Sequence, residues 1–153
     1  MSSSLLQLIG FEEYEFKLLY QGTRDGFDSS NFHSKCDNIP NTLTIIKSTN
    51  GNIFGGYTDQ AWDSSGQYKT DPNAFLFSLI NKYNKPTIMK IKDPQYSICC
   101  YNGYGPIFGD GFDLMISSNA NRKFLLEIQI VILISDVVIQ VNFLMDLMKF
   151  NHF

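Results

Sequence analysis

His33 and Cys36 are the residues whose types and spacing come nearest to a reactive pair. Three positions apart, they become neighbours on one face if the segment is helical. A cysteine beside a histidine can form a nucleophilic thiolate. No third group is identifiable that would orient the imidazole, so the favoured interpretation is a small buried cysteine beside a surface histidine. A thiol-based antioxidant that uses Cys36 with His33 is the alternative function.

Cys99 and Cys100 are the other two cysteines of the chain. Neighbouring residues on a strand point to opposite faces, so only one of them can join His33 and Cys36 around a metal. We therefore expect one cysteine in the core and one on the outer face. A vicinal disulfide between them would be strained. These residues predict no metal site.

The loop from Gly103 to Gly109 resembles a dinucleotide-binding fingerprint only in outline, because its third glycine comes one residue late and no helix follows. The acidic residues also have local explanations. Asp25, Asp28, Asp63 and Asp71 stand beside Ser or Gly, as capping and turn residues do, and Arg24 can pair with Asp25. The residues thus predict no catalytic group, no cofactor and no enzyme activity.

Short strands separated by turns make up most of the chain. The sequence predicts a helix at 1–10, a strand at 16–20, and a helix that begins after Asp28 and ends at Cys36. Asn50-Gly51 predicts a hairpin that joins strands 43–47 and 52–57, the second of which contains Gly55-Gly56. Further strands are expected at 74–80, 86–91, 96–101 and 112–116, with a long loop at 103–111. The predicted fold class is α+β, mostly β: a two-sheet antiparallel β-sandwich with a few flanking helices.

Composition and charge limit the function further. The chain has 153 residues, the size of one domain, and a net charge of −3 without a basic block. Nucleic-acid binding through a basic stripe is therefore disfavoured. The odd number of cysteines and the absence of a signal-peptide pattern favour a reducing, cytoplasmic location.

A series of motifs resembles the TLDc domain family, in family order and over about residues 11–121. The motifs are Leu18-Leu19-Tyr20-Gln21-Gly22-Thr23-Arg24-Asp25-Gly26-Phe27, Phe32-His33-x-x-Cys36-Asp37-Asn38, Thr42–Ser48 with Phe54-Gly55-Gly56-Tyr57, Trp62–Gly66, Ala74–Leu79, and Gly105-Pro106-x-Phe108-Gly109-x-Gly111-x-Asp113-Leu114. Asp110 stands where the family pattern has a glycine.

This resemblance implies a two-sheet β-sandwich flanked by helices. It also implies a link to oxidation resistance and to binding and regulation of the vacuolar-type proton ATPase. No catalytic residues are established for the family, so none are assigned here. The leading functional hypothesis is a non-enzymatic, protein-binding regulatory module.

Residues 124–153 depart from this pattern, because they contain no Gly or Pro and are mostly apolar. A tail anchor in a membrane is one alternative, but Asp136 and Gln140 interrupt the run before it reaches the roughly 18 uncharged residues a span needs. We therefore divide the chain into a helical segment at 1–10, a TLDc-like domain at 11–123 and an atypical tail at 124–153.

A shifted reading frame is the expected origin of this tail. TLDc domains continue with a Ser/Asn-rich strand region and a segment of the type G-S/T-N-E-x-Q-S-F. Plausible codons for residues 143–153, read from the third base, encode S-Y-G-S-N-E-V-Q-S-F. On this hypothesis the domain is incomplete at its C-terminal end. The alternative is a genuine, divergent tail, and sequencing across codons 115–153 distinguishes the two.

Overall fold

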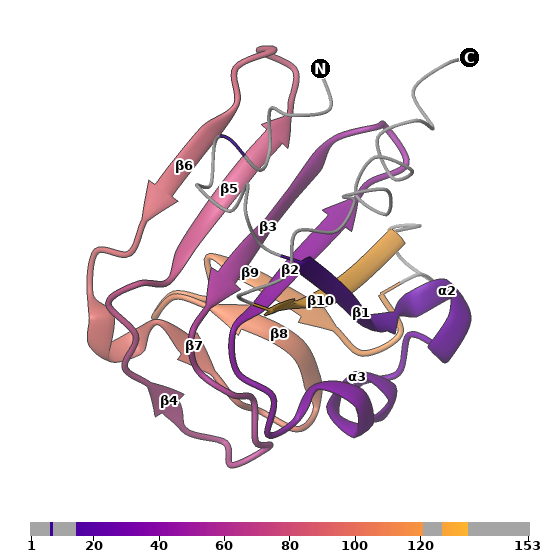
Figure 1. Cartoon of the computed structure of the whole chain (residues 1–153), viewed down its shortest axis with the longest axis vertical. Coiled ribbons are helices and arrows are strands. Elements are labelled where there is room, and N and C mark those ends of the chain that lie inside the picture. Colours follow the sequence, from indigo (N-terminus) through magenta and orange to yellow (C-terminus); the bar gives the residue numbers. More distant parts are fainter. Residues whose placement is uncertain (1–6, 8–14, 121–126, 135–153) are drawn as a thin grey trace.

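Two antiparallel sheets face each other in the computed structural model, which describes residue 7, residues 15–120 and residues 127–134 (Figure 1). The larger sheet contains, in spatial order, β1 (Glu15–Gln21), β10 (Glu127–Ile134), β2 (Thr42–Lys47), β3 (Ile53–Thr58), β5 (Phe75–Ile80) and β6 (Thr87–Lys90). The smaller sheet contains β4 (Tyr68–Lys69), β7 (Ile98–Cys99), β8 (Tyr104–Phe108) and β9 (Leu114–Ser117). The mostly β, two-sheet sandwich predicted from the sequence is therefore confirmed.

Three short helical segments connect the strands: α2 (Gly22–Asp25), α3 (Ser29–Cys36) and the 3₁₀ turn η1 (Pro94–Tyr96). Figure 1 shows α2 and α3 together beside the end of β1. The start of α3 is fixed by a capping box, in which the Asp28 carboxylate accepts a hydrogen bond from Ser30 N and the Asn31 side chain accepts one from Asp28 N. This is the cap expected from the sequence.

The hairpin predicted at Asn50-Gly51 joins β2 to β3, with Thr44 opposite Gly56 and Ile45 opposite Gly55. The two glycines allow a close approach of backbone and side chains. A Cβ at Gly55 would lie 1.9 Å from the Thr44 carbonyl oxygen, and one at Gly56 would lie 2.8 Å from the Phe108 ring of the opposite sheet. Neither position has room for a side chain.

The core between the sheets is built around Trp62, which is fully buried. Its ring centroid lies 5.6 Å from that of Phe32 on α3 and 5.6 Å from that of Phe108 on β8, both in edge-to-face geometry. The indole N–H donates to Thr42 Oγ1 at 3.1 Å, so the one polar atom of the ring is satisfied. Tyr20, Cys36, Ile46, Ile98, Cys100, Ile116 and Ala120 complete this buried cluster.

Two sequence predictions about the smaller sheet are wrong. Residues 104–108 form β8 rather than part of a loop, because Gly105 and Pro106 are buried and continue the strand beside β9. Cys99 and Cys100 are both buried, rather than one in the core and one outside. The reason is that both faces of β7 are covered, so alternation along the strand does not expose either residue.

Part of the apolar tail lies in the larger sheet. We expected residues from 124 onward to stand outside the domain, with the last strands missing. Instead the Ile- and Val-rich segment Glu127–Ile134 pairs with β1 on one side and β2 on the other. The shifted reading frame stays a prediction, and residues 121–126 and 135–153 lie outside the described residues, as does nearly all of the predicted helix at 1–10.

Within the described residues, no helix has the length and apolar character required to cross a membrane.

Gly55→Ala tests the close approach of β2 and β3. Because the added methyl group would overlap the Thr44 carbonyl, we expect a loss of about 1–3 kcal/mol in the free energy of unfolding, measured by urea titration. Gly103→Ala is the matched control, since no atom lies within 4 Å of its added Cβ, and it should change stability by less than about 0.5 kcal/mol. Equal stability of the two variants would contradict the packing described here.

Candidate functional site

The predicted His33–Cys36 pair lies on α3, and both side chains are buried. Cys36 has 0% of its surface exposed and His33 has 9%. Burial raises the pKa of the Cys36 thiol strongly, and the negative charges of Asp37 and Asp25 raise it further. A reactive cysteine needs the opposite, a lowered pKa and access to its substrate. The geometry therefore argues against Cys36 as a thiolate nucleophile.

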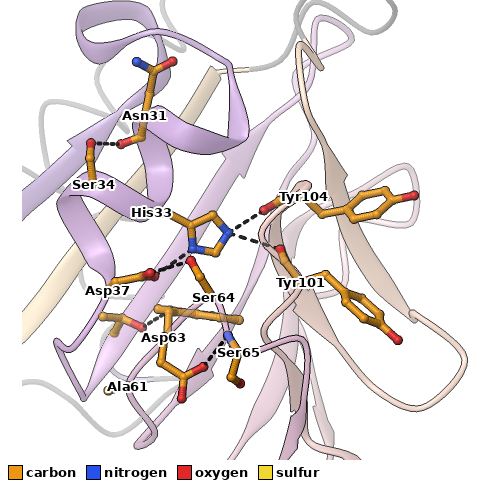
Figure 2. A network of polar contacts seen from close by, with 12 residues as sticks. Asn31, His33, Ser34, Asp37, Ala61, Asp63, Ser64, Ser65, Tyr101 and Tyr104 are labelled. Carbon is orange, nitrogen blue, oxygen red and sulfur yellow. Dashed lines mark hydrogen bonds and ion pairs between the residues drawn. The ribbon is translucent and has the colours of Figure 1, made fainter.

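His33 is the centre of a polar network rather than a surface residue (Figure 2). Its Nδ1 lies 2.7 Å from Asp37 Oδ1, and its Nε2 lies 2.9 Å from the Tyr104 carbonyl oxygen and 3.2 Å from that of Tyr101. The sequence prediction that no third group orients His33 is thus wrong. The missed group is Asp37, which the spacing of four residues along α3 places next to the imidazole.

The partners of His33 determine where its protons lie. A carbonyl oxygen can only accept a hydrogen bond, so Nε2 carries a hydrogen. On the other side of the ring, Nδ1 faces the Asp37 carboxylate at 2.7 Å. Both nitrogens of His33 are then occupied by the protein itself, and neither is free to take a proton from a substrate.

Asp37 extends the network to the turn that follows Trp62. Ser64 Oγ donates to Asp37 Oδ2 at 2.6 Å, so the carboxylate stands between the serine and the histidine. In a serine hydrolase the imidazole stands in the middle and activates the hydroxyl. Here the order is serine, carboxylate, histidine. The hydroxyl is therefore bonded to a group that holds it in place rather than to a base that activates it.

Asp63, in the same turn, is held by Lys69 and Ser65. Lys69 Nζ lies 2.7 Å from Asp63 Oδ2, and Ser65 N donates to Asp63 Oδ1 at 3.0 Å. Burial of the Asp63 carboxyl acts to raise its pKa, but the hydrogen bonds from Lys69 and Ser65 outweigh this effect and lower it well below the usual range. Lys69 also donates to the Ala61 carbonyl. The turn is thereby fixed on both sides of Trp62.

The remaining predicted acids also have structural roles. The Arg24–Asp25 pair expected from the sequence is confirmed at 2.6 Å, and the hydrogen bond from Arg24 lowers the pKa of Asp25. Asp28 caps α3, and the backbone hydrogen bond from Ser30 lowers its pKa. Asp71 is fully buried and accepts hydrogen bonds from Thr58 Oγ1 and from Asp59 N and Asn73 N. No group of three or more His, Cys, Asp or Glu in the described part of the chain is arranged to hold a metal ion.

A different kind of site lies on the outer face of the smaller sheet, and sequence reasoning missed it. The strand register places Tyr68, Cys99 and Ile107 on one face, because Tyr68 pairs with Cys99 and Cys99 with Ile107. Met115 pairs with Ile107 and lies on the same face. Ile98 and Phe108, which alternate with these residues, belong to the core on the opposite side. Because Cys99 and Ile107 are buried, neighbouring side chains must cover this outer face.

Aromatic rings surround this outer face. The rings of Tyr68 and Tyr96 are in contact at 5.2 Å between centroids, and those of Tyr101 and Phe112 at 6.2 Å. Tyr101 is 40% exposed and Met115 is 39% exposed. Figure 2 shows the rings of Tyr101 and Tyr104 pointing away from His33, while their carbonyl oxygens point toward it. We call Tyr68, Tyr96, Tyr101, Tyr104, Phe112 and Met115 the aromatic face.

His33 connects the buried network to the aromatic face. Its two carbonyl partners belong to Tyr101 and Tyr104, which begin and end the turn between β7 and β8. The imidazole therefore fixes the backbone from which two exposed rings project. The signal that could have indicated this surface is the density of Tyr and Phe between residues 96 and 112.

His33→Leu tests the network. The substitution removes the imidazole donor from the Tyr101 and Tyr104 carbonyls and the imidazole partner from the Asp37 carboxylate, so we expect a loss of about 2–4 kcal/mol in the free energy of unfolding. Ser34→Ala is the control on the same helix, because Ser34 is exposed and bonds only to the Asn31 carbonyl. The control should stay within about 0.5 kcal/mol of the unmodified chain. A His33→Leu variant as stable as this control would contradict the described role.

Thiol reactivity tests the alternative function directly. Alkylation of Cys36 by iodoacetamide at pH 7.5, followed by peptide mass spectrometry, should be at least about a hundredfold slower in the folded chain than in urea, because the thiol is buried and protonated. Cys100, whose pKa burial raises to about 12, is an internal reference and should be protected similarly. Rapid modification confined to Cys36 would restore the thiol-based hypothesis.

Asp63 should contribute to the loss of folding stability at acid pH. An aspartate in the unfolded chain titrates near a pKa of about 3.9, whereas that of folded Asp63 lies well below. Its stabilisation is therefore fully present above the unfolded pKa and is lost as the pH falls toward the folded one. Unfolding by urea between pH 6 and pH 3 should show a smaller loss of stability for Asp63→Asn than for the unmodified chain, and Lys69→Met should behave similarly. If stability falls equally with pH in the unmodified chain and in both variants, the assigned role of Asp63 is contradicted.

Comparisons with known proteins identify a family and several similar proteins. The TLDc domain family matches residues 2–128. The zebrafish (Danio rerio) MTOR-associated protein MEAK7 is 30% identical over 64 residues, which cover 42% of this chain and 14% of that protein. The chicken (Gallus gallus) MTOR-associated protein MEAK7 is 27% identical over 95 residues, which cover 60% of this chain and 17% of that protein.

The chain thus spans only about one seventh to one sixth of the length of these curated relatives. The family match, in contrast, extends over most of the chain, and it includes the capped helix, the glycine hairpin and the Trp62 turn described above. The chain belongs to the TLDc domain family.

Proposed function

We propose that this protein is a non-enzymatic, protein-binding regulatory module that acts through the aromatic face of its smaller sheet. The observation that carries the proposal is the exposure of Tyr101, Tyr104 and Met115 on one rigid surface. Exposed aromatic clusters on a folded domain are typical of protein interfaces, in which Tyr and Met are enriched.

The support from His33 is geometric. Binding surfaces lose less entropy when their backbone is already fixed, and the imidazole holds the carbonyls of Tyr101 and Tyr104 in place. The same contacts leave no free nitrogen on His33 for catalysis. Together these features favour recognition over chemistry.

The vacuolar-type proton ATPase is the partner that the family resemblance suggests, with a role in oxidative-stress resistance. The name of the similar proteins, MTOR-associated protein MEAK7, describes an association with mTOR for those proteins, and mTOR is therefore the second partner to be tested. Both proposals concern the same kind of activity, regulation through a protein contact.

The experiment is a pull-down of the ATPase's peripheral subunits with the full chain, with mTOR probed in the same eluate. The chain should retain the ATPase subunits. The double variant Tyr104→Glu/Met115→Glu, which places two negative charges on the aromatic face, should lose most of this binding, because a few central side chains carry most of the binding energy of an interface. Ser34→Glu/Asn50→Glu adds the same charge at exposed positions elsewhere and should bind normally.

Circular dichroism of each variant establishes that it is folded. Failure of the folded, unmodified chain to retain the ATPase subunits would overturn that partner. Retention by the unmodified chain and equally by Tyr104→Glu/Met115→Glu would show that a different surface is used.

A further inference from the structure

The β5–β6 hairpin is a basic element in an acidic protein. Four of the chain's 12 basic residues lie between positions 82 and 92, whereas positions 72–92 contain no acidic residue. These four residues are Lys82, Lys85, Lys90 and Lys92, and all are exposed. None of them forms an ion pair with a carboxylate in the described part of the chain. The positive charge of this hairpin is therefore available to a partner.

β6 is also an edge strand. It pairs with β5 on one side, through Thr87–Lys90, and has no strand on its other side among the described residues. No described strand pairs with the backbone N–H and C=O groups on that side, and such an edge is a template for another strand. Figure 1 shows the hairpin at the border of the larger sheet, with its turn extending beyond the smaller sheet.

A groove of about 280 Å³ runs beside this edge, where the two sheets separate. Its lining includes Leu76, Met89, Lys90, Lys92, Phe108 and Asp113. Met89 pairs with Leu76 and so shares its face, and Met89 is 45% exposed. The groove thus combines an apolar floor with two lysines beside the open edge.

We propose that β6 accepts an acidic, extended segment of a partner protein as an additional strand. Acidic side chains of the segment pair with Lys90 and Lys92, and the alternating apolar side chains enter the groove over Met89 and Leu76. This inference rests on the proposed protein-binding function and adds a second contact surface and the chemistry of the segment that it takes.

The lysines make the edge selective. Lysine on an edge strand normally prevents the uncontrolled pairing of strands, because a neutral or basic strand would have to bury unpaired ammonium groups. An acidic strand removes this penalty. Asp113 on the opposite wall repels acidic side chains that face it, so the acidic side chains should lie on the lysine side.

The test uses the full chain and a fluorescent eight-residue peptide in which valine and glutamate alternate. Fluorescence anisotropy should show binding that weakens as salt is raised, and a peptide with lysine in place of glutamate should not bind. Lys90→Glu/Lys92→Glu should lower the affinity about tenfold. Lys17→Glu/Lys35→Glu makes the same change in net charge at exposed positions on β1 and α3 and should leave the affinity within about twofold.

The strand geometry is tested with N-methylated peptides. A peptide N-methylated at alternate residues on one edge should lose binding, and methylation of the other edge should preserve it, because only one edge can pair with β6. Equal effects of the two methylation patterns, or equal effects of the two double variants, would overturn the proposal. So would binding to vesicles of 30% phosphatidylserine without binding to the peptide.

The test of the β6 site can be separated from the test of the proposed function. If the chain retains the ATPase subunits but does not bind the acidic peptide, the β6 site is wrong and the aromatic face is unaffected. If the peptide binds and the ATPase subunits are not retained, the acidic segment belongs to a different partner, and the β6 site holds.

Discussion

The burial of Trp62 is the constraint on which the rest of the structure depends. Its indole lies between Phe32 of α3 and Phe108 of β8, and its N–H is bonded to Thr42 at the start of β2. One side chain therefore touches both sheets and the principal helix. Gly56 makes this possible, because the Phe108 ring occupies the space where any other residue would place its Cβ.

The polar network extends from the same junction. Asp37 forms an isolated bridge to Trp62, and its carboxylate connects His33 on one side with Ser64 on the other. A histidine, an aspartate and a serine in contact would suggest hydrolysis if only their types were considered. The order of the contacts decides otherwise, since the imidazole faces carbonyl oxygens and the hydroxyl faces a carboxylate. The chemistry of this group is used to join α3 to the turns that carry Trp62 and Tyr101.

Local features of the fold could be predicted from the sequence, and long-range ones could not. The Asp28 cap and the Asn50-Gly51 hairpin depend on residues only a few positions apart, and both were predicted. The role of His33 depends on the Tyr101 and Tyr104 carbonyls, 68 and 71 positions away, which no local pattern reveals. β8 was missed because Gly105 and Pro106 usually indicate a loop, and only the neighbouring β9 makes them a strand. The aromatic face requires the strand register, so it too was beyond the sequence.

The position of β10 has a consequence for the order of folding. This strand lies between β1 and β2, so these two early strands never pair with each other. Glu127 pairs with Lys47, 80 positions earlier, and Ile134 pairs with Glu15 near the start of the described sheet. Closing such long loops is slow, because their entropy is lost before the pairing compensates for it. During synthesis β1 therefore stays unpaired on this side until residues 127–134 have left the ribosome.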